Sequence, residues 1–273
     1  MALQLHGGRG VELGSNFGHV SDQILAWYRP YLIAIPADVL KPGINEIIIR
    51  VVSQDSVGVG RVLVGPNAPV RDYYLKQYFR QITAPMAFNF AMIVLGGLVF
   101  LLWLGRRQEV ELLWLALSTL IWFLRNYQYF AEITPFNLAL FNALTVYSTY
   151  FASVATAAFY FCFTKLPYRN QIIAGLFLFG IPLVLAHAYL STATLICDGP
   201  PTMLIIGVAI SAVLDFKRHR DLQHGVLALT LAAMPVASLS DVMIARGSHG
   251  WDGNDFYLSV FGGLLYCVAF LIS

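Results

Sequence analysis

The sequence predicts a mixed fold, in which a partial β-sandwich outside the membrane is followed by a bundle of seven transmembrane helices. The 273 residues are 58% hydrophobic and only 12% charged, about half the charged fraction of a typical soluble domain. Short β-branched runs lie between residues 31 and 64, and long apolar segments follow from residue 83. We therefore divide the chain into a sandwich over 1–71, a stalk over 72–82 and a helix bundle over 83–273.

The β-domain is predicted from three runs rich in β-branched side chains, at 31–35, 45–52 and 59–64. Pro42-Gly43 between the first two is a strong turn signal, because proline fixes φ and glycine permits positive φ. These strands make about half of a small sandwich. Residues 1–20 show no basic flank followed by an apolar core, so no export signal is visible and we expect the domain to begin upstream of this chain.

The membrane part is predicted from the length of the apolar segments. Residues 72–80 are polar and aromatic, as expected of a stalk that reaches the membrane interface. Beyond them lie segments close to the roughly 20 helical residues that a bilayer core requires. The predicted spans are 83–105, 111–131, 136–163, 171–191, 199–216, 224–245 and 255–273.

The loops between these spans predict the orientation. Alternate loops are rich in Lys and Arg, whereas the loops between them contain only Arg246. The basic residues are Arg106, Arg107, Lys165, Arg169, Lys217, Arg218 and Arg220. Basic loops stay in the cytoplasm, so the N-terminal domain is predicted on the outer side of the membrane and the C-terminal end of the chain in the cytoplasm.

A few polar side chains fall inside the predicted spans and are candidates for a ligand site. Ionisable groups in a membrane are costly and often functional, and these residues gather in the outer third of the bilayer. The set is Asn89, Arg125, Asn126, Asn142, His187 and Asp241. The functional interpretation is a polar cavity in which Arg125 and Asp241 pair or grip a ligand. The alternative is that Arg125 snorkels to the lipid headgroups and that Asp241 marks an early end of its helix. His187, taken alone, is expected to be a packing residue with satisfied hydrogen bonds rather than a ligand-binding residue.

Two further groups of residues allow both a functional and a structural interpretation. Trp27, Tyr28 and Tyr31, next to Arg29, form either an aromatic sugar-binding surface or part of the sandwich core. The run 217–220, Lys-Arg-His-Arg, contacts a cytoplasmic effector or anionic lipid, or acts only as a topology anchor.

Several chemistries are excluded by the sequence. The four lysines lie outside the apolar spans, so a retinal Schiff base has no lysine to use. There is no HExxH motif, no phosphate-binding GxxxxGK[ST] motif and no glycine-rich dinucleotide turn. Cys162, Cys197 and Cys267 lack metal-ligand spacing. We therefore expect no cofactor, no metal, no catalytic centre in this chain and no nucleic-acid partner.

The motifs "RPYLIAIPADVLKPGINEIIIRV" and "VLVGP", followed by "YYLKQYFRQITAPM" and "IWFLRN", carry a family resemblance. Over residues 27–273 the chain resembles the bacterial seven-transmembrane receptors with diverse intracellular signalling modules, in the branch often joined to a histidine kinase. The resemblance implies a jelly-roll-like outer domain, a small-molecule ligand such as a carbohydrate, and a cytoplasmic kinase, diguanylate cyclase or phosphatase as output. It also implies a homodimer through that output domain, which we expect to lie beyond this chain.

We therefore expect the sensory input module of a membrane receptor, whose full-length form is a sensor histidine kinase or else a diguanylate cyclase. The alternative is a transporter or channel subunit with an outer β-domain. Pro182, Pro235 and the short fifth span favour that alternative, whereas the odd number of spans and the lack of an internal repeat speak against it.

Overall fold

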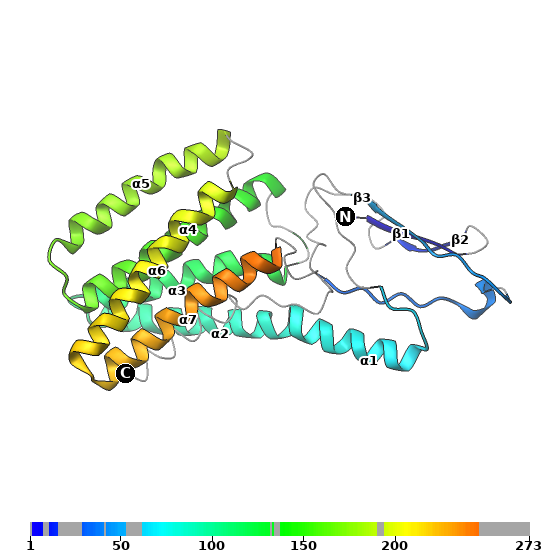
Figure 1. Ribbon diagram of the computed structural model, residues 1–273, viewed down its shortest axis with the longest axis horizontal. Helices are drawn as coiled ribbons and strands as arrows, with labels where there is room; N and C mark the ends of the chain where they lie inside the picture. Colours follow the sequence, from blue (N-terminus) through cyan, green and yellow to red (C-terminus); the bar gives the residue numbers. More distant parts are fainter. Residues whose placement is uncertain are drawn as a thin grey trace.

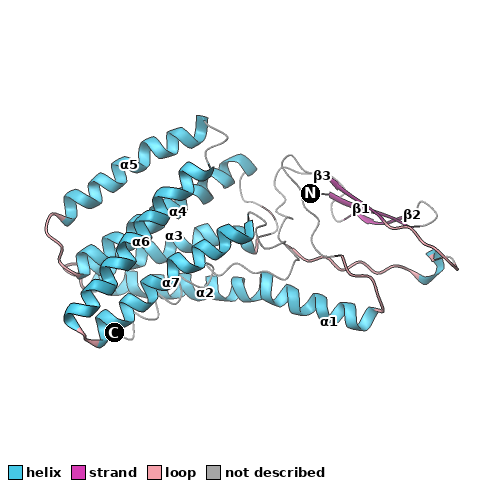
Figure 2. Ribbon diagram, viewed as in Figure 1, coloured by secondary structure: helices cyan, strands magenta, loops and turns pink. Residues whose placement is uncertain are grey.

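The protein is described by a computed structural model in which most of the described residues are helical (Figure 1, Figure 2). The described residues are 2–7, 11–15, 29–40, 42–52, 62–131, 133, 137–189 and 194–245. The α-helices among them are α1 (Asn67–Tyr78), α2 (Ala84–Gly105), α3 (Val110–Asn126), α4 (Leu138–Phe163), α5 (Arg169–Tyr189), α6 (Thr194–His219) and α7 (Leu222–Ala245). The shorter helical turns are η1 (Ala37–Val39), η2 (Phe79–Thr83) and η3 (Tyr127–Tyr129).

The predicted fold class, a partial β-sandwich followed by a seven-helix transmembrane bundle, is wrong. The described strands are β1 (Ala2–Gly7), β2 (Val11–Ser15) and β3 (Ile48–Val52). They form one antiparallel sheet in the order β2-β1-β3, with a register shift between Leu5 and His6. A sandwich needs two packed sheets, and only a single small sheet is found in the described residues.

Two of the three predicted strands are not strands in the described residues. The run 31–35 lies between Pro30 and Pro36 and belongs to no strand, and Tyr31 and Leu32 are exposed. A proline has no N–H to donate to a sheet and restricts the residue before it, so the two prolines that flank this run disfavour a strand despite its composition. Residues 62–64 also lie outside any strand, whereas β3 falls within the second predicted run.

The predicted stalk is a helix that continues into the first membrane helix. Residues 67–105 are helical throughout, with α1 joined to α2 by η2, a π-helical turn in which the N–H of Ala84 donates to the carbonyl of Phe79. Pro85 explains this turn, because proline has no N–H for the carbonyl four residues earlier and its ring crowds that carbonyl. A helix of this length is about 58 Å long, nearly twice the thickness of a bilayer core.

The chain is a multi-pass membrane protein by the length and composition of its helices. Three described helices are long and apolar enough to cross a bilayer: Asn67–Gly105, Ala143–Phe163 and Gly199–His219. The apolar part of α7, Leu222–Ala237, is shorter. Of the seven predicted spans, three correspond to helices that meet this length and composition in the part of the chain that the structure describes, and the predicted span 255–273 lies outside that part.

The core of the helical part is built where α2, α3, α4, α6 and α7 meet. Met92, Leu115, Phe159 and Leu231 from four of these helices are fully buried, and Ile205 of α6 packs with them. The helix α5 lies on the outside of α4, and the rings of Phe151 and Phe177 stack between them (Figure 1). Side chains such as Leu101 on α2 stay exposed, as expected where a helix faces lipid.

Candidate functional site

Asn89, in the membrane-length helix α2, has a polar side chain that is fully buried in the helix bundle. Its exposed fraction is 0%, and within the described part of the chain neither its amide nitrogen nor its amide oxygen has a hydrogen-bond partner. A buried amide without partners costs roughly 1–3 kcal/mol in proteins. Because a bilayer supplies no water to compensate, such a group needs an explanation, and native exceptions of this kind are often functional.

Arg125 and Asn126 lie at the end of α3, where the sequence predicted a polar site. Arg125 Nη1 donates to Asn126 Oδ1 at 3.1 Å. The guanidinium carbon lies 5.5 Å from the ring centre of Trp122 and 5.1 Å from that of Tyr129. Both distances are within the range of cation–π attraction, so the two rings and Asn126 fix the position of the charge.

The packing of α2 against α3 brings Asn89 to the level of Asn126. The helices are joined by the short loop after Gly105 and run antiparallel. Gly96 faces Thr119 so closely that an added Cβ would lie 3.2 Å from Thr119 Cγ2. Seven residues, two helical turns, separate Gly96 from Asn89 and Thr119 from Asn126. The structure therefore brings three predicted site residues, Asn89, Arg125 and Asn126, into one layer between α2 and α3.

The remaining predicted site residues cannot be assigned to this layer. Asp241 is in α7 and His187 is in α5, but their side chains lie outside the described part of the structure. Trp27 and Tyr28 lie outside the described residues altogether. The predicted pairing of Arg125 with Asp241 and the aromatic sugar-binding surface therefore stay predictions.

Arg29, which follows these two aromatic residues, links the N-terminal segment to the helices. Its Nη2 donates to the carbonyl oxygen of Phe130 at 2.6 Å. Phe130 follows η3, one helical turn beyond Asn126, and its ring packs against that of Phe90 in α2. A charge-assisted hydrogen bond is about twice as strong as a neutral one, so this contact holds the N-terminal segment against the end of α3.

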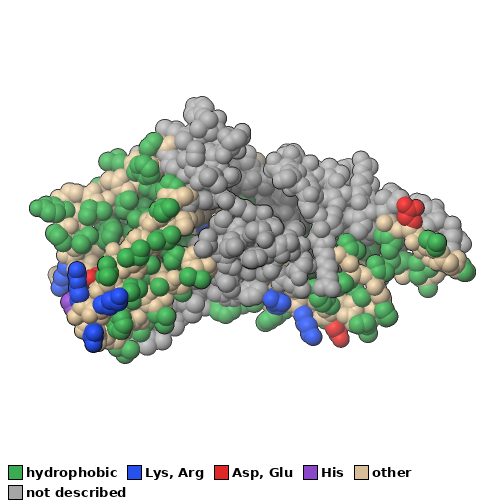
Figure 3. All heavy atoms as spheres, viewed as in Figure 1, with side chains coloured by type: hydrophobic (Ala, Val, Ile, Leu, Met, Phe, Trp, Pro, Cys, Tyr) green, Lys and Arg blue, Asp and Glu red, His purple; other side chains and the backbone are tan. Residues whose placement is uncertain are grey.

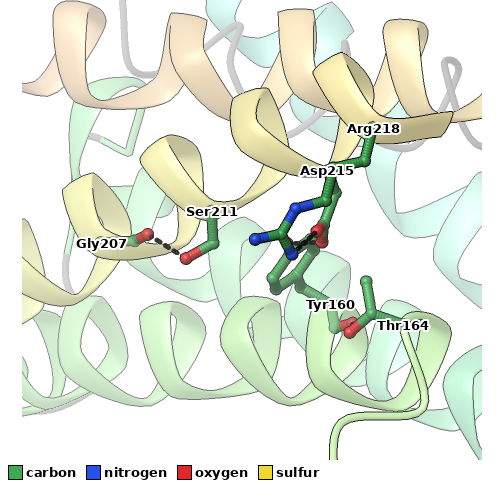
Figure 4. A network of polar contacts seen from close by, with 6 residues as sticks. All are labelled: Tyr160, Thr164, Gly207, Ser211, Asp215 and Arg218. Carbon is green, nitrogen blue, oxygen red and sulfur yellow. Dashed lines mark hydrogen bonds and ion pairs between the residues drawn. The ribbon is translucent and has the colours of Figure 1, made fainter. Parts of the chain in front are cut away.

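A second polar cluster lies at the opposite end of the helices and was missed from the sequence (Figure 4). The hydroxyl of Tyr160 in α4 donates a short hydrogen bond to Oδ2 of Asp215 in α6, and Arg218 Nη1 lies 3.8 Å from Asp215 Oδ1. Tyr160 is buried and its backbone carbonyl accepts from Thr164 Oγ1 at 2.9 Å. The signal was an aspartate inside an apolar helix, but Asp215 lies two residues before the basic run 217–220 and was grouped with it.

Asp221 begins the last described helix beside this cluster. The backbone N–H of His224 donates to Asp221 Oδ1 at 2.8 Å, and the ring Nδ1 of His224 lies 2.8 Å from both carboxylate oxygens. The backbone hydrogen bond, and after it the contact with the ring, lower the pKa of Asp221 below its usual 3.8. The imidazole of His219 stacks on that of His224 at 4.6 Å between ring centres. This geometry is that of a helix N-cap.

Two hydrogen bonds connect the helices between the two clusters. Ser118 Oγ of α3 and Thr156 Oγ1 of α4 are 2.6 Å apart and fully buried. The hydroxyl of Tyr150 in α4 donates to the carbonyl of Leu176 in α5 at 2.5 Å. Hydrogen bonds between helices supplement the close packing that holds membrane bundles together, so α3, α4 and α5 form one connected unit.

The described residues contain no group of three or more His, Cys, Asp or Glu side chains that could hold a metal ion. The polar layer of α2 and α3 offers an amide pair and a guanidinium, which suit ligand binding by hydrogen bonds. Comparison with known proteins found no matching family model, no similar curated protein and no similar solved structure.

Proposed function

We propose that this chain is the sensory input module of a bacterial membrane receptor, which relays a signal from outside the cell to a cytoplasmic output domain. The observation that carries the proposal is the uninterrupted helix from Asn67 to Gly105. It leads from the N-terminal segment, past the polar layer, to the basic end of the bundle (Figure 1). A movement of α1 is therefore transmitted to α2 without an intervening loop.

The contacts at the outer end support a role in detection. The carbonyl that Arg29 contacts lies one helical turn from Arg125 and Asn126. A movement of the N-terminal segment therefore displaces the end of α3 and, with it, the polar layer. The π-helical turn at Phe79–Thr83 lies in the same helix as Asn89. Such turns are frequent at functional sites, and the loss of this one would rotate α1 relative to α2.

The contacts across the bundle support transmission to the inner end. Close packing joins α2 to α3 at Gly96, the Ser118–Thr156 hydrogen bond joins α3 to α4, and Tyr160–Asp215 joins α4 to α6. A ligand shifts such a system only if it binds one arrangement more tightly than the other. A difference on the order of 1–3 kcal/mol suffices for useful coupling.

The remaining parts of the proposal come from the basic loops and from the family resemblance. The positive loops favour a cytoplasmic position for the inner cluster and an outer position for the N-terminal segment, and the resemblance favours a bacterial inner membrane. The resemblance favours a small-molecule ligand such as a carbohydrate. It also favours a histidine kinase, or else a diguanylate cyclase, as the output, acting as a homodimer.

The relay is tested by moving the outer end and measuring the inner end. The full chain, with its native cysteines replaced by serine, is reconstituted in nanodiscs with spin labels at positions 107 and 220. Arg29→Ala removes the contact with the α3 end, and Arg71→Ala removes a cation from α1 as the matched control. We expect Arg29→Ala to shift the label distance by about 1–2 Å, the scale of helix shifts in signalling, and Arg71→Ala to leave it unchanged. Identical distances in all three proteins would indicate a static anchor.

A transporter remains the second candidate because prolines lie inside three successive helices. Pro182 lies inside α5, Pro200 and Pro201 inside α6, and Pro235 inside α7. A proline inside a helix removes a backbone hydrogen bond and weakens the helix at that point, and helices that break at such points form the binding sites of many transporters. Uptake of radiolabelled glucose and glutamate into proteoliposomes tests this function, and uptake above that of protein-free vesicles would replace the receptor proposal.

A further inference from the structure

Exposed cations follow the ends of the three membrane-length helices at one end of the molecule. The helices α2, α4 and α6 all run toward this end and finish at Gly105, Phe163 and His219. Lys and Arg side chains gather there in the space-filling view (Figure 3). Seven cations and four carboxylates lie here, and the cations are Arg106, Arg107, Lys165, Arg169, Lys217, Arg218 and Arg220.

Three of the four carboxylates are already occupied by contacts within the protein. Glu109 Oε1 lies 3.3 Å from Arg106 Nη1. Asp215 accepts from Tyr160 and pairs with Arg218, and Asp221 is held by His224. The fourth, Glu111, is in the first turn of α3, where its charge compensates the positive end of the helix dipole.

Four cations stay exposed, and among the described residues none of them has an acidic partner: Arg107, Lys165, Lys217 and Arg220. Their side chains are not needed to cap the helices. The backbone N–H of Lys165 donates to the carbonyl of Cys162 at 3.2 Å, and that of Arg220 donates to Phe216 at 2.8 Å. Arg107 lies 5.8 Å from the ring centre of Trp103, an aromatic residue typical of the membrane interface.

We propose that these four residues form a binding surface for the phosphate headgroups of anionic phospholipids. Lys217 lies in the last turn of a membrane-length helix and the other three lie directly after such helices, which places all four at the depth of the lipid phosphates. Lysine and arginine bind phosphate oxygens by charge-assisted hydrogen bonds, and each cation near an anionic leaflet strengthens binding about fivefold. The surface binds lipid whether or not the chain is a receptor, so this inference stands apart from the proposed function.

Native mass spectrometry of the full chain tests the proposal. The protein is loaded with equal amounts of phosphatidylglycerol and phosphatidylcholine in mild detergent, and the lipids retained are counted. The test variant is Lys217→Gln/Arg220→Gln. The control is Arg71→Gln/Lys76→Gln, which removes two exposed cations from α1, at the opposite end of the molecule from the four cations.

The wild-type chain is expected to retain phosphatidylglycerol in preference to phosphatidylcholine. The test variant is expected to lose this preference by about 25-fold, at about fivefold per cation, whereas the control keeps it. High salt is expected to weaken it, because exposed charges are screened. Equal retention of both lipids by the wild type, or an equal loss in the control variant, would overturn the proposal. Unchanged helical circular dichroism in each variant shows that a loss of lipid is not a loss of fold.

Discussion

Asn89 provides the most direct test of the polar layer, because its environment predicts that truncation to alanine does not destabilise the protein. Its side chain is fully buried and neither polar atom has a partner among the described residues. Asn126 lies in α3 at the level of Asn89. It is also fully buried but accepts a hydrogen bond from Arg125. Truncation of each residue to alanine removes an amide of the same size from the same layer. The two substitutions are therefore matched in side chain and burial and differ in hydrogen bonding, although Asn126 is the last residue of α3 and Asn89 lies inside α2.

The free energies of unfolding of Asn89→Ala and Asn126→Ala are expected to differ by a few kcal/mol. Asn89→Ala removes a group whose desolvation costs roughly 1–3 kcal/mol, so we expect the free energy of unfolding to rise, or to stay unchanged where the small cavity offsets the gain. Asn126→Ala removes the part-buried hydrogen bond from Arg125 and should lower the free energy of unfolding by about 1–3 kcal/mol. Reversible unfolding in mixed detergent micelles with increasing dodecyl sulfate measures both. A loss in Asn89→Ala as large as that in Asn126→Ala would refute the reasoning.

Three further predictions concern individual contacts. Tyr160→Phe removes the hydrogen bond to Asp215 and should lower the free energy of unfolding by about 1.5–3 kcal/mol, which the same unfolding titration measures; no change would mean that α4 and α6 are held by packing alone. The lowered pKa of Asp221 stabilises the folded state above its unfolded pKa, and this stabilisation is lost as the pH falls from about 4 through the lowered folded value. The melting temperature of Asp221→Asn should therefore depend less on pH in this range than that of the wild type, and parallel curves would contradict the assignment. Gly180→Ala places a Cβ 2.6 Å from a buried tyrosine ring and should lower the free energy of unfolding by about 1–3 kcal/mol, whereas Gly175→Ala in the same helix meets open space and should not.

The sequence predicted the helices better than the β-structure for a physical reason. A stretch such as 83–105 is apolar over its whole length, so its helix, α2, begins one residue from the predicted start and ends at the predicted residue. The β-domain was wrong because strands depend on a partner. The run 31–35 has the composition of a strand but lies between two prolines, and β1 pairs with residues that are far away in the sequence.

The candidate site was also predicted only in part from the sequence. The position of Asn89, Arg125 and Asn126 in one layer follows from counting residues along antiparallel helices, and the structure places Asn89 and Asn126 level with each other. The Tyr160–Asp215 contact depends on which faces of α4 and α6 meet, and a single sequence does not encode that in a readable pattern. The π-helical turn at the end of the predicted stalk was also missed, although Pro85 marks its place.

The central claim is that one continuous helix carries the chain from outside the membrane to its basic inner end. Single cysteines at positions 76 and 107, in a chain without its native cysteines, mark the two ends of that helix. Intact bacterial cells with a permeabilised outer membrane are treated with a thiol reagent that does not cross the inner membrane. We predict labelling at position 76, and labelling at position 107 only after the inner membrane is opened. Labelling of both positions in intact cells, or of position 107 alone, would contradict the account.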